Sequence, residues 1–222
     1  MKKIDPVFAV LGALSIVQLA ASIAICPSLP ETIPFHWNAS GQVDNWASRP
    51  WSILLAAFPL VMIVLAAVIP RLDPKSENYE RHWPSYRLIM AMVTILMAGL
   101  YWMTIAISLD LWNPDVSRVV PAAIGVLFIV IGNYLPRVRH NYTLGIRLPW
   151  TLASERVWTK THRFGGALFM IVGLVLVAGV FISPTARFVS LIFGLAVLIG
   201  ATSFYSWILW KKEQRGEKKN TD

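Results

Sequence analysis

Six long apolar runs dominate the sequence and restrict its fold more than any other feature. A helix needs about 20 mostly apolar residues to cross a bilayer core roughly 30 Å thick. Backbone polar groups inside lipid must pair within their own segment, so runs of this kind cross as helices. The sequence therefore predicts an all-α fold, a polytopic membrane helical bundle with six transmembrane helices. The predicted spans are 6–26, 51–70, 87–109, 118–135, 165–183 and 187–209.

The composition agrees with a membrane protein. Hydrophobic residues make up 56% of the chain and charged residues only 14%, whereas a soluble domain has about 25% charged residues. The apolar content excludes intrinsic disorder, and the single cysteine, Cys26, excludes a disulfide scaffold. Lys2 and Lys3 precede the first run as they would in a signal peptide. That run is longer than a usual cleavable core, so we expect an uncleaved helix.

Lysine and arginine residues are distributed very unevenly between the two sides of the predicted bundle. Of the 20 in the chain, 17 fall at the amino terminus, in the 71–87 and 136–164 connections and in the tail. The other side carries only Arg49, Arg118 and Arg187. The positive-inside rule therefore predicts that both termini are cytoplasmic and that the 27–50 loop is external. The net charge of +8 is then a cytoplasmic collar. We expect no direct nucleic acid binding, because no DNA-reading motif accompanies it.

The charge pattern and the loops also predict the domain organisation. We expect an amino-terminal membrane domain over 1–109, a second membrane domain over 110–210 and a basic cytoplasmic tail over 211–222. All 12 acidic residues lie in loops or tails, which argues against proton-coupled transporters and ion pumps. Arg87, Arg118 and Arg187 each stand first in a span, where we expect them to reach lipid headgroups. Ala196 and Gly200 form only a weak small-residue pair for helix packing.

The external loop, 27–50, is too long to be a simple connector. Its prolines keep it non-helical, and Asn38 to Gly41 predicts a turn between two short extended pieces. The tryptophans Trp37, Trp46 and Trp51 suit a loop that rests on the membrane interface. Glu31, His36 and Asp44 match no metal-ligand spacing. A hydrogen-bonded loop structure is therefore favoured over a metal site.

The cytoplasmic loop, 136–164, is the more distinctive of the two. Gly145 and Pro149 break its first half into turns. Thr151 can then cap a helix from about Leu152 to Arg163, with Glu155 in the first turn. Helical spacing predicts two faces on this helix. One carries Glu155, Trp158, Thr159 and His162, and the other is a basic stripe of Arg156, Lys160 and Arg163.

Two interpretations of this helix remain open. It is either an interfacial helix, with Trp158 among the headgroups and the basic stripe on lipid phosphates, or a docking surface for a cytoplasmic partner. We also hypothesise that the guanidinium of Arg147 binds Glu155, so that Trp150 and Trp158 face a common surface. Glu155 and His162 could form an acid–base pair, but no nucleophile, metal set or phosphate loop surrounds them. We therefore expect no enzyme activity, cofactor or metal.

Residues in both loops resemble a known family. The cytoplasmic loop is similar to the signature of the SdpI family, which comprises bacterial multi-helix membrane proteins. The external loop resembles an amino-terminal domain of unknown function that is often fused to that signature. The cytoplasmic residues are Asn141, Gly145, Arg147, Pro149, Trp150, Thr151, Glu155, Trp158, Thr161, His162 and Arg163. The external residues are Pro34, His36, Trp37, Asn38, Gly41 and Asp44.

The resemblance implies a function that the residues alone do not. It implies a multi-pass protein of the bacterial plasma membrane that confers immunity to a secreted, membrane-active peptide toxin. It also implies signal transduction, in which the protein holds a small cytoplasmic repressor at the membrane when toxin is present. The lipid bilayer, the toxin and the repressor are the expected partners. A transporter or channel for a small or lipidic substrate, and a membrane enzyme, remain as alternatives.

Overall fold

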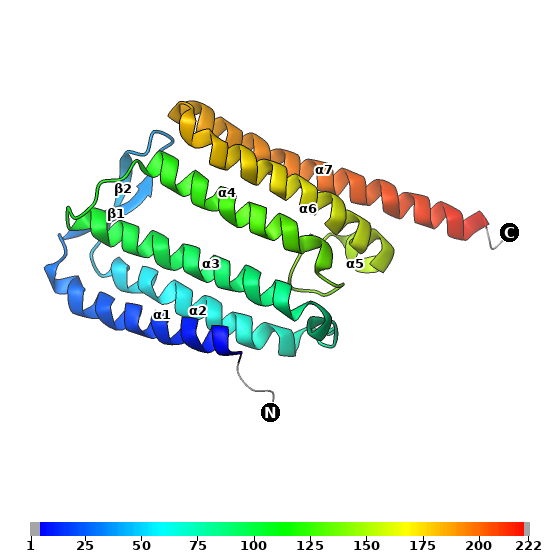
Figure 1. The fold of residues 1–222 in the computed structure, drawn as a ribbon, viewed down its shortest axis with the longest axis horizontal. Coiled ribbons are helices and arrows are strands. Elements are labelled where there is room, and N and C mark those ends of the chain that lie inside the picture. Colours follow the sequence, from blue (N-terminus) through cyan, green and yellow to red (C-terminus); the bar gives the residue numbers. More distant parts are fainter. Residues whose placement is uncertain (1–4, 220–222) are drawn as a thin grey trace.

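The computed structural model describes residues 5–219, with side chains through Gly216. Lys2, Lys3 and the end of the predicted basic tail, 220–222, lie outside the described residues. The chain forms a bundle of long helices with one small sheet (Figure 1). Its elements are α1 (Pro6–Ile25), β1 (Thr32–Trp37), β2 (Val43–Ser48), α2 (Trp51–Leu72), α3 (Asn78–Ser108), α4 (Val116–Tyr134), α5 (Pro149–Ala153), α6 (Glu155–Ala178) and α7 (Pro184–Lys219). Short 3-10 turns follow α1, α4 and α6.

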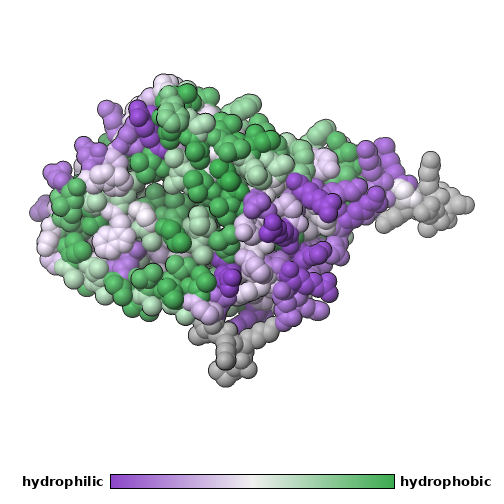
Figure 2. All heavy atoms as spheres, viewed as in Figure 1, coloured by the Kyte–Doolittle hydropathy of each residue, from purple (hydrophilic) through white to green (hydrophobic). Residues whose placement is uncertain are grey.

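Six helices within the described residues are long and apolar enough to cross a membrane. They are α1, α2, α3, α4, α6 and α7, and each overlaps one of the predicted runs. The prediction of an all-α polytopic membrane bundle is thereby confirmed. Figure 2 shows hydrophobic side chains across the middle of the visible face, with hydrophilic residues gathered towards its two ends.

The long helices form two groups of three. Helices α1, α2 and α3 pack together, helices α4, α6 and α7 pack together, and α3 lies beside α4 (Figure 1). The start of α1 and the end of α7 both lie towards the end of the bundle where α5 lies, here termed the motif end (Figure 1). The β1–β2 sheet lies at the opposite end, here termed the hairpin end (Figure 1).

Glycines bring α4 and α6 into backbone contact. A Cβ on Gly125 would lie 2.7 Å from the carbonyl oxygen of Gly173, and a Cβ on Gly132 would lie 2.5 Å from that of Gly166. The two glycines on each helix are seven residues apart, a spacing that returns to the same helix face. Small residues at such a contact allow close van der Waals packing in lipid. Small residues four positions apart, the pattern considered in the sequence, do not reveal these contacts between α4 and α6.

Helix α1 turns polar side chains towards its neighbours and apolar ones away from them. Ser15, Gln18 and Ser22 are all at most 5% exposed, whereas Leu14 and Val17 are more than half exposed. The Gln18 side chain donates from Nε2 to the carbonyl oxygen of Ala56 on α2, at 3.2 Å. Hydrogen bonds between helices hold a bundle together in lipid, where apolar burial supplies little driving force.

Two helices extend beyond their predicted spans at the motif end. Helix α3 begins at Asn78 and kinks at His82, where φ is −129° and ψ is 19°. Pro84 follows two residues later, and proline removes a backbone donor and crowds the preceding turn. Helix α7 has 36 residues, about 54 Å at roughly 1.5 Å per residue. It therefore projects well past the rest of the bundle (Figure 1).

Arg187 does not reach towards headgroups as expected. It is 2% exposed, and its Nη1 atom lies 3.7 Å from the carboxylate of Asp115 in the α3–α4 connection. Arg118 lies 2.8 Å from the same carboxylate and keeps an exposed side chain. The Ser117 hydroxyl and then the two arginines lower the pKa of Asp115. The expectation for Arg187 is therefore wrong, because helix packing buries a charge that the sequence places at a helix end.

Candidate functional site

The segment between α4 and α5 folds onto the α2–α3 connection at the motif end. We term this contact the motif junction. It is formed by Asp73, Lys75, Tyr79, His140, Asn141 and Thr143. Hydrogen bonds across it join parts of the chain that are more than 60 residues apart.

Asn141 fixes the local shape of this segment. The side chain is 0% exposed. Its amide nitrogen donates to the carbonyl oxygens of Arg139 and Leu144, at 2.8 and 3.0 Å. Its amide oxygen accepts from the backbone N–H groups of Thr143 and Leu144, at 2.9 and 2.7 Å. All four hydrogen-bonding positions of the amide are thus satisfied, and the turn is closed by one side chain.

Asp73 ties the same segment to the α2–α3 connection. It is 4% exposed. Its Oδ2 atom accepts from the Tyr142 backbone N–H at 2.9 Å and from the hydroxyls of Tyr79 and Thr143 at 3.2 Å. The two hydroxyls also contact each other. The sequence analysis missed Asp73, although an Asp-Pro pair in a polar connection is a signal for a turn.

His140 makes the second link across the motif junction. The Lys75 ammonium donates to its Nδ1 atom at 2.7 Å, and the Asn78 side chain donates to its carbonyl oxygen at 2.7 Å. An acceptor at Nδ1 places the proton of the neutral ring on Nε2. Burial, and then the Lys75 charge, lower the pKa of His140. The ring is therefore neutral at pH 7.

Trp158 and His162 form a buried stack beside the motif junction. Their ring centroids are 4.0 Å apart, and the two side chains are 1% and 0% exposed. The indole nitrogen donates to the Val138 carbonyl oxygen at 2.9 Å. His162 accepts the Ile146 backbone N–H on Nε2 at 3.1 Å and bonds the Trp158 carbonyl oxygen through Nδ1 at 2.8 Å. Both ring nitrogens are thus used to hold the loop onto α6.

Gly145 is required where the loop passes this stack. Its φ is +126°, a conformation that L side chains rarely adopt. A Cβ at this position would run into the His162 ring and lie 3.2 Å from the Trp158 ring. The sequence analysis grouped Gly145, Trp158 and His162 in one motif, and the structure brings all three into contact.

The start of the helix after the motif differs from the prediction. Thr151 does not cap a helix from Leu152 to Arg163. It is 0% exposed within α5, where its hydroxyl accepts from the Leu148 N–H at 2.8 Å and lies 2.9 Å from the Ile146 carbonyl oxygen. Ser154 is the cap, since its hydroxyl accepts from the Val157 N–H at 3.2 Å. Helix α6 then continues from Glu155 into the fifth span without a break.

An interfacial helix with Trp158 among headgroups is therefore wrong, because Trp158 is enclosed by protein. Trp150 and Trp158 also do not face a common surface: the Trp150 indole donates to the Ser206 hydroxyl on α7, whereas the Trp158 indole donates to Val138. The basic stripe of Arg156, Lys160 and Arg163 is exposed, as expected.

Arg147 has a different partner from the one hypothesised. Its guanidinium donates to the Tyr142 carbonyl oxygen at 2.8 Å. Glu155 is exposed at the start of α6, and no ion pair joins it to Arg147 in the described part of the chain. Pro149 is exposed at the start of α5, and Thr161 is fully buried on α6. Arg147 thus closes its own loop and does not tie the loop to α6.

These contacts determine what the motif can do chemically. Asn141 and His162 direct their side-chain hydrogen bonds to backbone groups, which leaves neither free to move a proton. His82 and His140 each have a buried Nε2 atom without a hydrogen-bond partner among the described residues. Across residues 5–219, no group of three or more metal-ligating side chains is placed to hold an ion. The arrangement is that of a rigid support.

The external motif forms an antiparallel hairpin, and the turn predicted at Asn38–Gly41 is confirmed. The Asn38 side-chain oxygen accepts from the Ser40 and Gln42 N–H groups, at 2.9 and 3.1 Å. His36 Nδ1 and Asp44 Oδ1 are 2.6 Å apart across the strands, so the predicted hydrogen-bonded loop structure is present. Pro34 is buried, Trp37 is half-buried and Trp46 is 56% exposed.

The tip of the hairpin touches the second group of helices. Gly41 has a φ of +79°, and a Cβ there would lie 2.8 Å from the backbone nitrogen of Ser117 at the start of α4. Ser117 donates to Asp115, whose carboxylate also faces Arg118 and Arg187. The hairpin from the first half of the chain is therefore in contact with α4, from the second half.

Comparisons with known proteins agree with this two-part anatomy. Residues 137–206 match the SdpI/YfhL protein family, and residues 13–63 match a domain of unknown function, DUF1648. The chain is 27% identical over 178 residues to immunity protein SdpI of Bacillus subtilis (strain 168), covering 80% of this chain and 82% of that protein. No solved structure matches significantly. The chain is thus a multi-pass membrane protein that is similar to the SdpI/YfhL protein family over residues 137–206 and carries a DUF1648 segment before that part.

Proposed function

We propose that this protein protects a bacterial cell from a secreted peptide toxin that attacks the cell membrane. The observation that carries the proposal is the alignment with an immunity protein, because it covers four fifths of both chains and not one shared segment. Six candidate membrane spans support the proposal, because the toxin is proposed to attack the membrane that these helices would cross.

We further propose that the motif end faces the cytoplasm and the hairpin end faces outward. The uneven distribution of lysine and arginine supports this orientation, since 17 of the 20 lie on the motif side. The packing of the helices in two groups of three supports a division into membrane domains near residue 109. Cysteines placed at Ser40 and Ser154, in a chain without Cys26, should be labelled from opposite sides of the membrane. Labelling of both by an impermeant reagent on intact cells would overturn the orientation.

The signalling part of the proposal is that the motif end holds a small transcriptional repressor. Arg156, Lys160 and Arg163 offer an exposed basic surface on α6, and α7 projects beyond the bundle beside it. Such a surface attracts an acidic partner and steers its approach. The rigid motif junction holds the first turns of α6 in one position, as a docking surface requires.

The test of immunity is survival of a sensitive bacterium that expresses the chain. We expect protection against at least one member of a panel of membrane-active peptide toxins, compared with cells that carry an empty vector. Gly200→Leu serves as a matched control, because that position is exposed and a Cβ built there meets nothing within 4 Å. Unchanged survival across the panel, with the protein confirmed in the membrane, would count against immunity.

The test of signalling uses a fluorescently tagged small repressor encoded beside the gene. We expect it to move to the membrane when toxin is added. Replacing Arg156, Lys160 and Arg163 by glutamine should abolish this movement. The control for loss of charge alone is a variant in which glutamine replaces Lys211 and Lys212 on the projecting part of α7. If the repressor moves to the membrane equally well in both variants, the basic stripe is excluded as the docking surface.

A further inference from the structure

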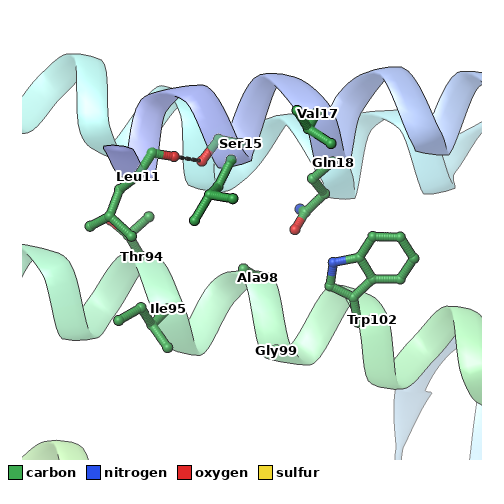
Figure 3. A pocket seen from close by; sticks show the side chains of 10 residues that line it. Leu11, Ser15, Val17, Gln18, Thr94, Ile95, Ala98, Gly99 and Trp102 are labelled. Carbon is green, nitrogen blue, oxygen red and sulfur yellow. Dashed lines mark hydrogen bonds between the residues drawn. The ribbon is translucent and has the colours of Figure 1, made fainter. Parts of the chain in front are cut away.

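A groove of about 460 Å³ lies between α1 and α3, within the membrane-spanning part of the bundle. Figure 3 shows the two helices side by side with the lining side chains between them. Apolar residues such as Leu11, Leu14 and Val17 make up most of the lining. Leu14 and Val17 are 59% and 64% exposed, so the groove opens towards the surrounding lipid.

Two polar groups point into this groove. Gln18 is 5% exposed, and its Nε2 atom is held by the Ala56 carbonyl oxygen at 3.2 Å. That bond fixes the amide and leaves its oxygen without a hydrogen-bond partner among the described residues. The Trp102 indole N–H also has none within the described chain. Figure 3 shows the Gln18 amide and the Trp102 nitrogen both directed into the space between the helices.

The depth of these groups limits what can bind them. Gln18 lies seven residues before the end of α1, and Trp102 lies six before the end of α3. At roughly 1.5 Å per residue, both lie about 10 Å along their helices from the hairpin end, within the candidate membrane spans. A phospholipid carries its hydrogen-bonding groups at the surface, so its chains at this depth can satisfy neither group. An unpaired polar group in such an apolar setting is costly.

The groove also has room for the close approach of a helix. Ala98 and Gly99 lie on its α3 side. A Cβ built on Gly99 meets nothing within 4 Å. Small residues allow helix backbones to approach closely in lipid, and polar side chains then join them by hydrogen bonds.

We propose that this groove binds one apolar helix of a membrane-inserted peptide. A polar side chain about 10 Å below the end of that helix pairs with the Gln18 amide oxygen and the Trp102 indole N–H. Apolar side chains of the peptide fill the remaining volume over Ala98 and Gly99. This inference deepens the proposed function and rests on it, since the peptide is then the toxin that the protein captures within the membrane.

The binding test uses two synthetic helical peptides of leucine and alanine in phosphatidylcholine vesicles. One peptide carries a single asparagine about 10 Å from the end of its helix, and the other peptide carries none. A benzophenone side chain placed at Leu14 in the groove is the crosslinker, and one at the exposed Ile199 on α7 is the control. We expect at least about threefold more crosslinking at position 14 for the asparagine peptide than for the apolar one.

Matched variants check that the groove is responsible. Gly99→Leu fills the open space, and Gly200→Leu adds the same side chain at an equally open position on α7. Trp102→Phe removes the indole donor and keeps an aromatic ring. We expect loss of crosslinking in Gly99→Leu, a weaker asparagine preference in Trp102→Phe and no change in Gly200→Leu. Equal crosslinking of both peptides, or capture of phospholipid or of a second copy of the chain in place of the peptide, would overturn the inference.

The same variants separate this inference from the immunity proposal. If the unmodified chain protects cells and Gly99→Leu protects equally well at equal abundance, the groove inference fails and immunity stands. If the groove binds the asparagine peptide but the chain protects against no toxin, immunity fails and the groove remains a helix-binding site.

Discussion

The motif junction and the external hairpin use polar side chains in opposite ways. Asp73, Asn141 and His162 are at most 4% exposed. Asp73 and His162 accept backbone N–H groups 69 and 16 residues away, and Asn141 closes the local turn between them. His36 and Asp44 bond to each other at side-chain exposures of 65% and 41%. Buried polar groups that pair with one another favour one arrangement of the chain. An exposed pair adds little to stability, so the fold of the hairpin depends less on this pair than the motif junction depends on its buried bonds.

Glycine substitutions should give the largest losses of stability in the two regions. Gly145→Ala combines a strained φ with a clash against His162, and we expect it to lower the free energy of unfolding by about 3 kcal/mol. Gly41→Ala adds a Cβ 2.8 Å from the Ser117 backbone nitrogen, but its φ of +79° lies in the left-handed region that an alanine can reach at moderate cost, so we expect a smaller loss of about 2 kcal/mol. Unfolding by denaturant in detergent micelles measures both. Gly200→Ala is the neutral control, and equal losses at Gly41 and Gly145 would remove the distinction.

Removing a carboxylate should also lower the free energy of unfolding more at the motif end than at the hairpin end. Asp73→Asn replaces a buried carboxylate that accepts from one N–H and two hydroxyls on Oδ2, and we expect a loss of about 2 kcal/mol. Asp44→Asn disturbs only an exposed pair, so we expect a loss below about 0.5 kcal/mol. The same unfolding measurement applies, with membrane abundance as a second readout. A loss at Asp44 as large as at Asp73 would show that the hairpin pair is structural.

The dependence of stability on pH should reflect His140. Burial and Lys75 hold the pKa of this ring below its ordinary value of about 6.5 in the folded protein. The unfolded chain therefore takes up the proton first, and stability should decline as the pH falls below about 6.5. His140→Gln keeps an acceptor for Lys75 and should make the decline less steep. Asp115, whose pKa is lowered, contributes to this dependence only near or below pH 4. Identical pH profiles for the two proteins would exclude His140 as a source.

Features encoded locally could be predicted from the sequence. The six spans follow from runs of apolar residues, and the Asn38–Gly41 turn follows from turn chemistry within four residues. The start of α6 could not be decided in this way, because both Thr151 and Ser154 suit a helix cap. Burial of Trp158 against Val138 accompanies the start at Glu155, and that contact is 20 residues away in the sequence.

Features that depend on distant contacts were missed or misjudged. Asp73 gains its role only from Tyr142 and Thr143, about 70 residues away. Arg187 stands at a helix end in the sequence but is enclosed by packing near Asp115. The bonds of Asp73 and the burial of Arg187 leave no trace in the residues next to them in the sequence, so rules based on neighbouring residues could not predict either.

The smallest effect, and the sharpest test of the motif, concerns two exposed arginines, Arg147 in the loop and Arg156 on α6. A bidentate bond from Arg147 to a carboxylate would make Arg147→Lys damaging, because an ammonium cannot reproduce a planar fork. The structure gives Arg147 one bond to the Tyr142 carbonyl oxygen, which a lysine can also donate. We therefore expect Arg147→Lys and Arg156→Lys each to change the free energy of unfolding by less than about 0.5 kcal/mol. Protection and repressor recruitment, corrected for membrane abundance, are the second measurement. Loss of either function in Arg147→Lys alone, at normal stability, would mean that the guanidinium binds a partner. In that case the proposed docking surface at the motif end would extend from the basic stripe on α6 to the loop that carries Arg147.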